Sequence, residues 1–470
     1  MTSLHDLSAL EQAAAVRSRQ TSAVDLIEHY AERIAEHDAT VGAFVTLTLE
    51  AAREQALEAD HAVARGDELA PLHGVPIAIK DLNLTEGVPT KLGSKAFEDF
   101  VPPFSDAVVD KLRAAGTISL GKTNTPEFGL PCYTETDIAP PARTPWDLGR
   151  SAGGSSGGAG AAVASGLVAA AQGSDGGGSV RIPASVCGLF GIKVSRGRIS
   201  RGPLQGDING LSWDGPLART VRDGAAMLDA MQGMTLGDPH WAPPPGQSYL
   251  SCADEPPGPL RIGRTRDPVI ATAEVHPHVI EAYDAAGALL TELGHEVVDI
   301  MPPYGPELAP DFEILWCVTA AGVPVDPARE GLLLPLTRYL RERGRAMSGT
   351  DYTGAIGRLQ LATRFGLLAT AAYDVLLLPT LAQPPAPVGW FTETGDPAEE
   401  FDRMKRWTPF TALFNMTGQP AVNVPLHWSP DGLPIGVMLV GRPADEAMLI
   451  RLSAQLEQAR PWRDRHPALW

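Results

Sequence analysis

The chain of 470 residues has 44% hydrophobic and 20% charged residues, the balance of a globular protein with a core of useful size. Its formal net charge of −18 disfavours nucleic acid and anionic membranes as partners. The four cysteines form no CxxC motif and no Cys/His pairing at zinc spacing, so we expect neither a metal site nor a disulfide framework. The N-terminus lacks the features of a signal peptide, and no apolar run approaches the ~18–20 residues of a membrane span. We therefore expect a cytoplasmic protein.

Residues 1–70 are expected to form a helical segment packed on the rest of the chain. Ser22 and Asp25 resemble a capping box, and the apolar residues that follow fall on one helical face. Residues 49–65 predict a second, more solvated helix that ends near Gly66.

From residue 70 onward, strands and helices alternate. Residues 75–79 predict a short apolar strand that ends in Lys80. We expect Ser105 to cap a helix running through Leu112, and residues 117–120 to form the next strand. This alternation predicts an α/β fold, as a single large domain whose central mixed β-sheet is covered by helices on both faces.

A Pro-rich segment, residues 237–259, separates two halves of the chain. Beyond it, strands are predicted at residues 261–262, 296–300, 375–378, 421–424 and 435–440. Helices are predicted at residues 276–292 and 446–459. A second Pro-rich stretch, residues 381–397, is expected to be a long surface loop.

Lys80 stands at the end of an apolar strand, with Asp81 beside it. Taken alone this signal is weak, because most such lysines are solvated surface charges. A lysine at the mouth of an apolar strand can be desolvated, however, and burial favours the neutral amine. Since a neutral amine accepts a proton near pH 7, Lys80 is a candidate base.

Two glycine-rich segments carry serines, at residues 153–158 (GGSSGG) and 173–184 (GSDGGGSVRIPA). A flexible linker is the simplest interpretation of such composition. We reject it because residues 161–164 and 167–171 read as a helix and a buried strand. In the second segment Ser179 follows three glycines, whose N–H groups can form a concavity that binds negative charge. Two such turns, joined by one helix and one strand, can return close together in space.

With these segments in view, the chain resembles the amidase signature family. The matching motifs occur in the family's order and cover residues 8–235 and 410–460 most closely. They are GVPIAIKD (74–81), GKTNTPEF (121–128), PWDL (145–148), the two glycine-rich segments, CGLFGIK (187–193), GPLARTVRD (215–223), TGQPAV (417–422), GLPIG (432–436) and GRP (441–443).

The resemblance implies a serine hydrolase that needs no metal or organic cofactor. Ser179 would be the nucleophile, and Ser155, after a cis peptide bond, would relay a proton to Lys80. The N–H groups of Gly176, Gly177, Gly178 and Ser179 would form the oxyanion hole. The family usually has Thr or Ile at the position of Gly176, so the oxyanion loop is the part of the site that departs most from the family's pattern.

The resemblance also divides the chain into segments. Residues 71–235 would be the catalytic core, residues 236–405 a divergent substrate-selecting region, and residues 406–470 the C-terminal part of the same core. The expected substrate is a small-molecule amide, which could be an aliphatic amide, an anilide or an oligoamide, with ester or carbamate side activity. Homodimers are common among relatives, so a homodimer stays open here.

Further residues are candidates for the substrate pocket or for supporting roles. Asp175 and Arg181 are favoured as structural residues over a catalytic carboxylate and a substrate-binding cation. Ser156 either bonds to Lys80 or caps the following helix. The remaining candidates for lining the pocket are Asn124, Glu127, Phe128, Cys132, Tyr133 and Cys317, of which Cys317 is favoured as a small core residue.

Three alternatives compete with this interpretation. Ser156 also fits G-x-S-x-G, which would suggest an α/β-hydrolase elbow with Asp238 and His240, but would leave Ser179 without a role. A phosphate-binding loop lacks its Gly-Lys-Ser/Thr ending. The closest rival is the glutamine-hydrolysing subunit of a tRNA-dependent amidotransferase, which shares the catalytic core and would work with partner subunits.

Overall fold

One mixed sheet organises the molecule. The computed structural model describes residues 3–204 and 208–470. Within them, eleven strands pair in the order β1-β3-β2-β4-β6-β5-β10-β11-β9-β7-β8. The strands are β1 (Phe44–Leu47), β2 (Pro76–Lys80), β3 (Ile118–Thr123), β4 (Ala170–Asp175), β5 (Phe190–Lys193), β6 (Trp213–Ala218), β7 (Arg261–Arg264), β8 (Glu296–Asp299), β9 (Val375–Pro379), β10 (Ala421–Trp428) and β11 (Pro434–Gly441). The predicted class, a single α/β domain with a mixed sheet, is confirmed.

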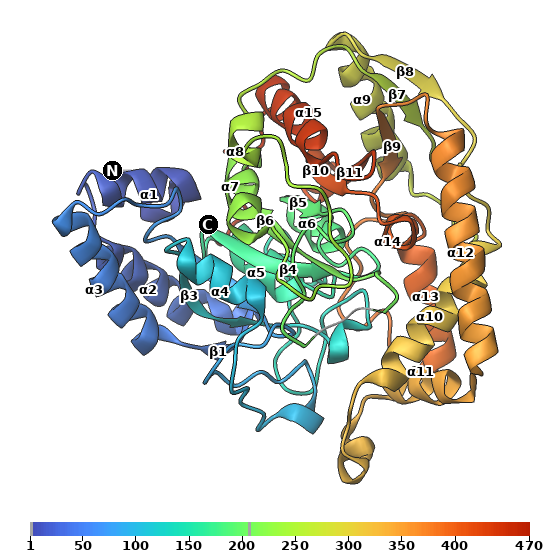
Figure 1. Ribbon diagram of the computed structural model, residues 1–470, viewed down its shortest axis with the longest axis horizontal. Coiled ribbons are helices and arrows are strands. Elements are labelled where there is room, and N and C mark those ends of the chain that lie inside the picture. Colours follow the sequence, from blue (N-terminus) through green and yellow to red (C-terminus); the bar gives the residue numbers. More distant parts are fainter. Residues whose placement is uncertain (1–2, 205–207) are drawn as a thin grey trace.

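Helices cover the sheet and also lie beyond both of its ends. In Figure 1, α1–α3 lie at the left and α10–α13 at the right, with the sheet between them. The α-helices are α1 (Ala9–Arg17), α2 (Ala23–Val41), α3 (Leu49–Arg65), α4 (Ala107–Ala114), α5 (Gly157–Ala164), α6 (Arg181–Cys187), α7 (Val221–Met231), α8 (Tyr249–Cys252), α9 (Pro277–Glu292), α10 (Leu308–Gly322), α11 (Pro335–Ala346), α12 (Gly349–Ala369), α13 (Pro397–Trp407), α14 (Leu413–Thr417) and α15 (Glu446–Ala459). Short 3-10 turns are η1 (Leu4–Asp6), η2 (Lys95–Phe97), η3 (Glu127–Gly129) and η4 (Pro327–Leu332).

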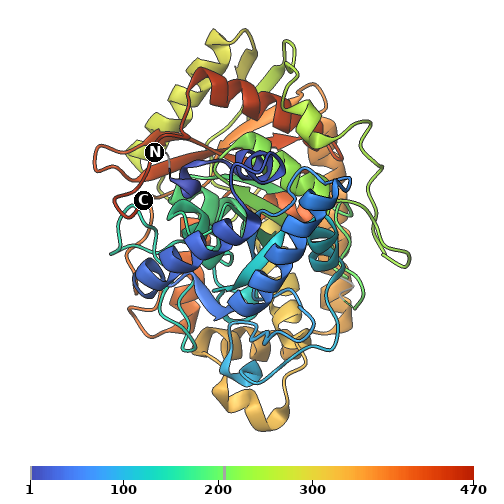
Figure 2. The ribbon, with the colours of Figure 1, turned by 90° about the vertical axis from the view of Figure 1, so that its left-hand side faces the viewer.

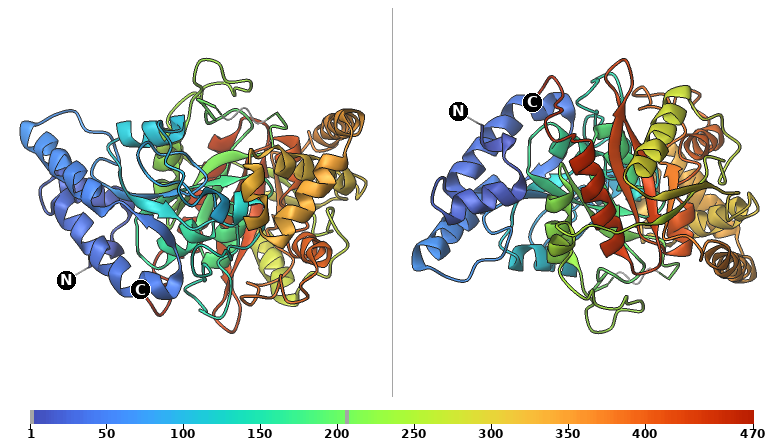
Figure 3. Two further views of the ribbon diagram at one scale, coloured as in Figure 1. Left: turned by 90° about the horizontal axis from the view of Figure 1, so that it is seen from below. Right: turned by 90° about the horizontal axis from the view of Figure 1, so that it is seen from above.

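Alternating side chains of the strands divide the core into two layers. Ile77 and Ile79 of β2 pack in the cluster that includes α4, α7, α9 and α15, whereas Ala78 packs in the cluster that includes α5 and α6. Seen from above in Figure 3, α9 and α15 lie over the sheet. The small side chains of α5 let that helix approach the sheet closely, which places the two glycine-rich segments near the end of β2.

The two ends of the chain meet beside the N-terminal helices (Figure 2). Trp470 Nε1 donates to Asp6 Oδ1 over 2.8 Å, and the Trp470 ring stacks on His466 with centroids 4.2 Å apart. The predicted capping box of Ser22 and Asp25 begins α2, and residues 49–65 form α3 as expected.

Two predicted boundaries need correction. Ser105 does not cap α4: its hydroxyl accepts from the Glu86 N–H, and Asp106 occupies the N-cap position. The strand predicted at residues 167–171 begins only at Ala170 and continues to Asp175, so the first residues of the second glycine-rich segment are strand and not turn. Pairing with β2 and β6 on both sides stabilises this strand despite its polar residues.

The second half differs more from expectation. The stretch at 381–397 has no helix or strand before α13 starts, and it is a surface loop only in part: Leu381, Ala382 and Phe391 are buried, whereas residues 392–396 are exposed. Helices α10 to α13 were not predicted. No helix within residues 3–204 and 208–470 combines the length and apolar character that a membrane crossing requires.

Candidate active site

Lys80 ends β2 and is completely buried. Its Nζ lies 2.8 Å from Ser155 Oγ, 3.0 Å from Ser174 Oγ and 3.2 Å from Ser174 O. Its backbone N–H donates to Gln172 Oε1 over 2.9 Å, which ties the end of β2 to β4. Burial lowers the pKa of Lys80 to about 7, against the opposing effect of the carboxylates of Asp175 and Asp214. The amine is therefore substantially neutral near neutral pH.

Ser155 lies in the first glycine-rich segment, just before α5. The peptide bond between Gly154 and Ser155 is cis, as the resemblance implies. Glycine is required at position 154, because an added Cβ would lie 2.7 Å from the backbone nitrogen of Tyr133. This close approach of two backbones holds Ser155, which is only 2% exposed, against Lys80.

Ser179 lies in the turn between β4 and α6 and is 5% exposed. Its carbonyl oxygen accepts from the N–H of Ser156 over 3.2 Å, so the two glycine-rich segments are joined directly next to both serines. The expected return of the two turns to one place is therefore observed.

Backbone N–H groups surround Ser179. Those of Gly176, Gly177 and Ser179 have no hydrogen-bond partner within the described residues. The Gly178 N–H differs from the expectation, because it donates to Asp175 Oδ1 over 2.8 Å and is not available to a substrate. Three N–H groups remain that can point at a developing oxyanion.

Asp175 and Arg181 form a buried pair that holds this turn. Arg181 donates to both Asp175 oxygens, over 2.8 and 2.9 Å, and Asn415 Nδ2 donates to Asp175 Oδ1 over 2.9 Å. Asp175 also accepts from the Val180 N–H over 3.1 Å. Burial opposes ionisation, but the guanidinium of Arg181 lowers the pKa of Asp175 below its ordinary value. These bonds support the structural role that the sequence favoured for the pair.

A polar network behind Lys80 was missed in the sequence. Gln172 Nε2 donates to Asp214 Oδ1 over 2.8 Å and to Asn83 Oδ1 over 2.9 Å, and Asn83 Nδ2 donates to Asp214 over 3.1 Å. Burial raises the pKa of Asp214. The one available signal was the run of polar residues Gln172, Ser174 and Asp175 in a short strand whose other residues are Ala and Gly.

Five sequence candidates do not line the cavities beside the serines. Ser156 bonds neither to Lys80 nor to the start of α5, since its Oγ donates to Ser174 O over 3.1 Å. Asn124 Nδ2 donates to Pro140 O over 2.8 Å. Tyr133 donates to Glu400 and stacks on Phe391, with centroids 4.5 Å apart.

Cys317 is the fourth of these candidates and is fully buried in the core. The sequence favoured Cys317 as a core residue and did not single out its neighbour Trp316, which lines both cavities. Glu127 does not line them either, because it accepts from Ser94 Oγ and from the Leu334 N–H.

Two cavities meet at the serines. One, of about 540 Å³, is lined by Ser155 and Phe128 among others, and one of about 40 Å³ is lined by Ser179 and Cys132. Phe128 and Cys132, both sequence candidates for the pocket, belong to these linings. Both cavities share Leu130 and Trp316, so they adjoin.

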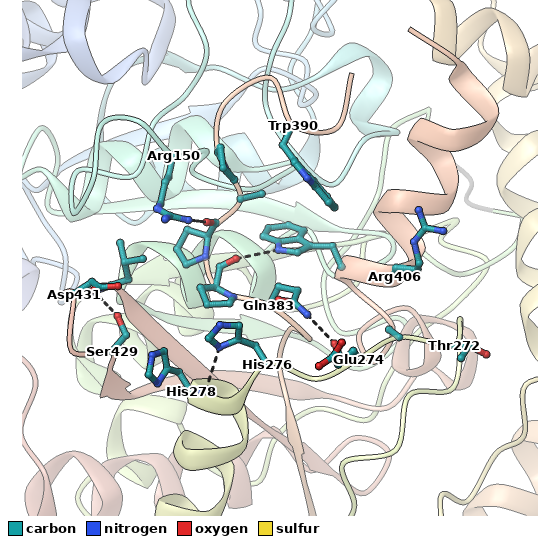
Figure 4. A pocket seen from close by; sticks show the side chains of 17 residues that line it. Arg150, Thr272, Glu274, His276, His278, Gln383, Trp390, Arg406, Ser429 and Asp431 are labelled. Carbon is teal, nitrogen blue, oxygen red and sulfur yellow. Dashed lines mark hydrogen bonds between the residues drawn. The ribbon is translucent and has the colours of Figure 1, made fainter. Parts of the chain in front are cut away.

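A third cavity, of about 550 Å³, lies apart from these residues and is shown in Figure 4. Two of its polar side chains are paired with backbone carbonyls: Arg150 donates to Pro385 O over 2.6 Å, and Gln383 Nε2 donates to Glu274 O over 2.7 Å. None of Lys80, Ser155 and Ser179 lines it. Its size alone does not make it the reactive site. In the described part of the chain, no cluster of three or more His, Cys, Asp or Glu residues is arranged to hold a metal ion.

Comparison with known proteins places the chain among amide hydrolases. The family model described as Amidase matches residues 25–450. A putative amidase of Synechocystis sp. is 37% identical, over 97% of this chain and 89% of the relative. An acylamidase of Rhodococcus erythropolis is 35% identical, over 99% and 98%.

Solved structures give the same result. The structure of 6-aminohexanoate cyclic dimer hydrolase superposes with a TM-score of 0.91 at 33% identity, covering 100% of both chains. That of a bacterial aryl acylamidase of the amidase signature family superposes with a TM-score of 0.87 at 26% identity, covering 98% of both chains.

Proposed function

Because the chain belongs to the amidase family and hydrolyses amides, we propose that it does so through an acyl-enzyme on Ser179, with Ser155 and Lys80 as the proton relay. One observation carries the proposal: a buried, largely neutral lysine contacts Ser155 at 2.8 Å, next to a serine surrounded by unpaired N–H groups.

In the first step, Ser179 Oγ attacks the amide carbonyl carbon. Its proton passes to Ser155 Oγ, and the proton of Ser155 passes to Lys80 Nζ. The carbonyl oxygen becomes an oxyanion, which the N–H groups of Gly176, Gly177 and Ser179 stabilise. Losing one such donor costs about 3 kcal/mol of transition-state stabilisation in other hydrolases.

In the second step, the C–N bond breaks and the amine leaves with a proton from Ser155, which regains one from Lys80. Water then attacks the acyl-enzyme by the same relay, releasing a carboxylic acid and restoring Ser179. The hydrogen bonds of Lys80 suit this cycle, because a neutral amine has two N–H donors and one lone pair. When the neutral amine donates to the two oxygens of Ser174, its lone pair is left to accept the proton of Ser155, 2.8 Å away.

Names of relatives suggest which amides to test. Acylamidase and aryl acylamidase point to N-acyl amines and anilides, and the cyclic dimer hydrolase points to oligoamides. The alternative, a glutamine-hydrolysing subunit, is not favoured, because relatives named amidase and acylamidase match nearly the whole chain.

The decisive experiment compares wild type and Ser179→Ala on anilides, alkyl amides, oligoamides and glutamine. We expect wild type to hydrolyse at least one non-glutamine amide and the variant to lose that turnover. Rapid quenching with an activated ester should leave an acyl group on the peptide that contains Ser179. Full turnover by Ser179→Ala, or an adduct on another residue, would reject the assignment.

A further inference from the structure

The two cavities beside the serines differ greatly in size. On the scale on which one water needs about 10–15 Å³, the cavity at Ser179 holds only a few heavy atoms, since its volume is about 40 Å³. The cavity at Ser155, at about 540 Å³, lies within the ordinary range of ligand sites. A substrate that spans both is therefore restricted on one side only.

The chemistry assigns a part of the substrate to each side. The leaving nitrogen takes its proton from Ser155, so the amine portion extends from the Ser155 side, and the acyl carbon is bonded to Ser179. We propose that this amidase selects amides with a short, uncharged acyl group and a large amine portion, with Trp316 as the wall that sets the acyl limit. This inference rests on the proposed function and makes it more specific.

The walls of the small cavity are suited to an apolar acyl group. Ile182, Phe312, Phe401 and Met404 line it. Its charged member, Lys405, is neutralised by Glu313 and Asp402, each with an oxygen 2.6 Å from Nζ.

The other polar groups of the small cavity are also satisfied or neutral. Thr408 Oγ1 donates to Met404 O over 2.9 Å, and burial raises the pKa of Cys132, which keeps the thiol neutral. No side chain of the cavity offers an unpaired charge to an acyl chain, so a charged acyl group would lose its hydration without compensation.

The large cavity has a different character. It combines apolar walls, such as Leu92, Phe128 and Val318, with polar side chains, among them Asn83, Arg201 and Thr319. Such a lining accepts an extended or aromatic amine that carries a few polar groups.

Trp316 of α10 separates the two spaces. Its ring stacks on Phe312, with centroids 5.2 Å apart, and its Cη2 lies 3.5 and 3.7 Å from the positions of Cβ atoms added at Gly176 and Gly177. Trp316 is half-buried and lines both cavities. Val318, two residues later on the same helix, lines only the large cavity. Removing the indole would merge the cavities above Ser179.

The test uses two substrate series on wild type and the variants Trp316→Ala, Trp316→Phe and Val318→Trp. One series is acetyl to octanoyl anilides, and the other is acetamides of methylamine, aniline and naphthylamine. In wild type we expect kcat/KM to fall at least about tenfold from acetyl to octanoyl anilide, the size of effect that extra methylenes cause in a closed pocket. Trp316→Ala should reduce this ratio about tenfold, and Trp316→Phe by less.

Val318→Trp is the matched control, because it fills the amine side. It should lower kcat/KM for the naphthyl amide against the methyl amide and leave the acyl-length ratio unchanged within about threefold. Ratios within one variant do not depend on its folded fraction. A wild type that prefers octanoyl to acetyl, or a Trp316→Ala enzyme with the wild-type ratio, would overturn the inference.

Failure of the proposed function gives a different result. If the quenched adduct is absent from Ser179, the mechanism itself is wrong. If the adduct forms there and the acyl-length ratio is flat, only the assignment of the cavities is wrong.

Discussion

At the scale of single residues, the site depends on a lysine whose surroundings remove its charge. The Nζ of Lys80 is buried among the oxygens of Ser155 and Ser174, with no carboxylate in hydrogen-bond contact. Water would stabilise the ammonium ion far better than these neutral groups do, and this is the physical cause of the lowered pKa.

The first prediction concerns pH. Because the pKa of Lys80 is lowered to about 7, the neutral amine predominates above that pH and is lost as the pH falls through it. We expect kcat/KM to rise about tenfold per pH unit below pH 6 and to level off above pH 8. Lys80→Ala should reduce kcat by at least about a thousandfold without loss of folding. A wild-type rate that keeps rising to pH 10.5, where an ordinary lysine titrates, would contradict the prediction.

A second prediction addresses the carboxylate behind the lysine. The charge of Asp214 favours the ammonium form of Lys80, so Asp214→Asn should shift the acidic limb of the pH profile to lower pH. Asp106→Asn is the matched control. Asp106 contacts the same Asn83, over 3.3 Å, but is not among the charges that shift the pKa of Lys80. The kcat/KM profiles of both variants between pH 5 and 9 test this; equal shifts in the two would argue for a general change in packing.

At the scale of elements, the turn between β4 and α6 is held from a distant part of the chain. Thr411 Oγ1 donates to Gly177 O over 2.6 Å, and Asn415 Nδ2 donates to the Asp175 carbonyl over 2.9 Å. Gly178 has φ +134°, and a Cβ added there would lie 2.4 Å from Thr411 Oγ1. The three glycines therefore form one ordered turn, set by residues that precede β10.

The third prediction tests this support. Thr411→Val keeps the shape and removes the donor to Gly177, which should let the oxyanion N–H groups move. We expect kcat to fall between about tenfold and a hundredfold, below the loss of a whole oxyanion donor, with KM little changed. Thr411→Ser restores the hydroxyl and should recover most of the rate. Equal values of kcat in Thr411→Val and wild type would show that the turn keeps its conformation without the hydrogen bond from Thr411.

Elements were predicted well where their pattern has a clear period. The strands at β9, β10 and β11 and the helices α9 and α15 appear at the expected positions. Helix α10 was missed because it packs against α11, α12 and the site, so its apolar residues leave no regular stripe. The end of β4 was read as a turn because Gln172, Ser174 and Asp175 are polar. They are polar because they hold Lys80 and the glycine turn, which only the tertiary structure reveals.

At the scale of the whole molecule, motifs predicted the residues that we propose to react but could not supply their surroundings. Lys80, Ser155 and Ser179 were predicted from resemblance and from glycine spacing. Asn415 is 240 positions from Asp175, and no local pattern connects the two. No local pattern singles out Trp316 either, and it lies in the region where the sequence resembles the family least.

The N-terminal helices are attached to the sheet domain by a similar long-range contact. Asp223, in α7, is buried and accepts from the N–H groups of Ala9 and Leu10 over 3.1 and 3.0 Å. It thus satisfies the first turn of α1 from 213 or more positions away. Arg219, just before α7, adds a bond of 2.9 Å to His5 O.

This attachment gives the last prediction. Asp223→Ala leaves one buried and one partly buried N–H group without a partner, so the free energy of unfolding should fall by about 1–3 kcal/mol. Asp25→Ala, which removes only an exposed cap of α2, is the matched control and should cost about 1 kcal/mol or less. Urea unfolding followed by circular dichroism measures both. Because α1 contacts none of the reacting residues, kcat of folded Asp223→Ala should stay within about twofold of wild type. If Asp223→Ala and Asp25→Ala lost the same free energy of unfolding, Asp223 would not be what fixes α1 to the sheet.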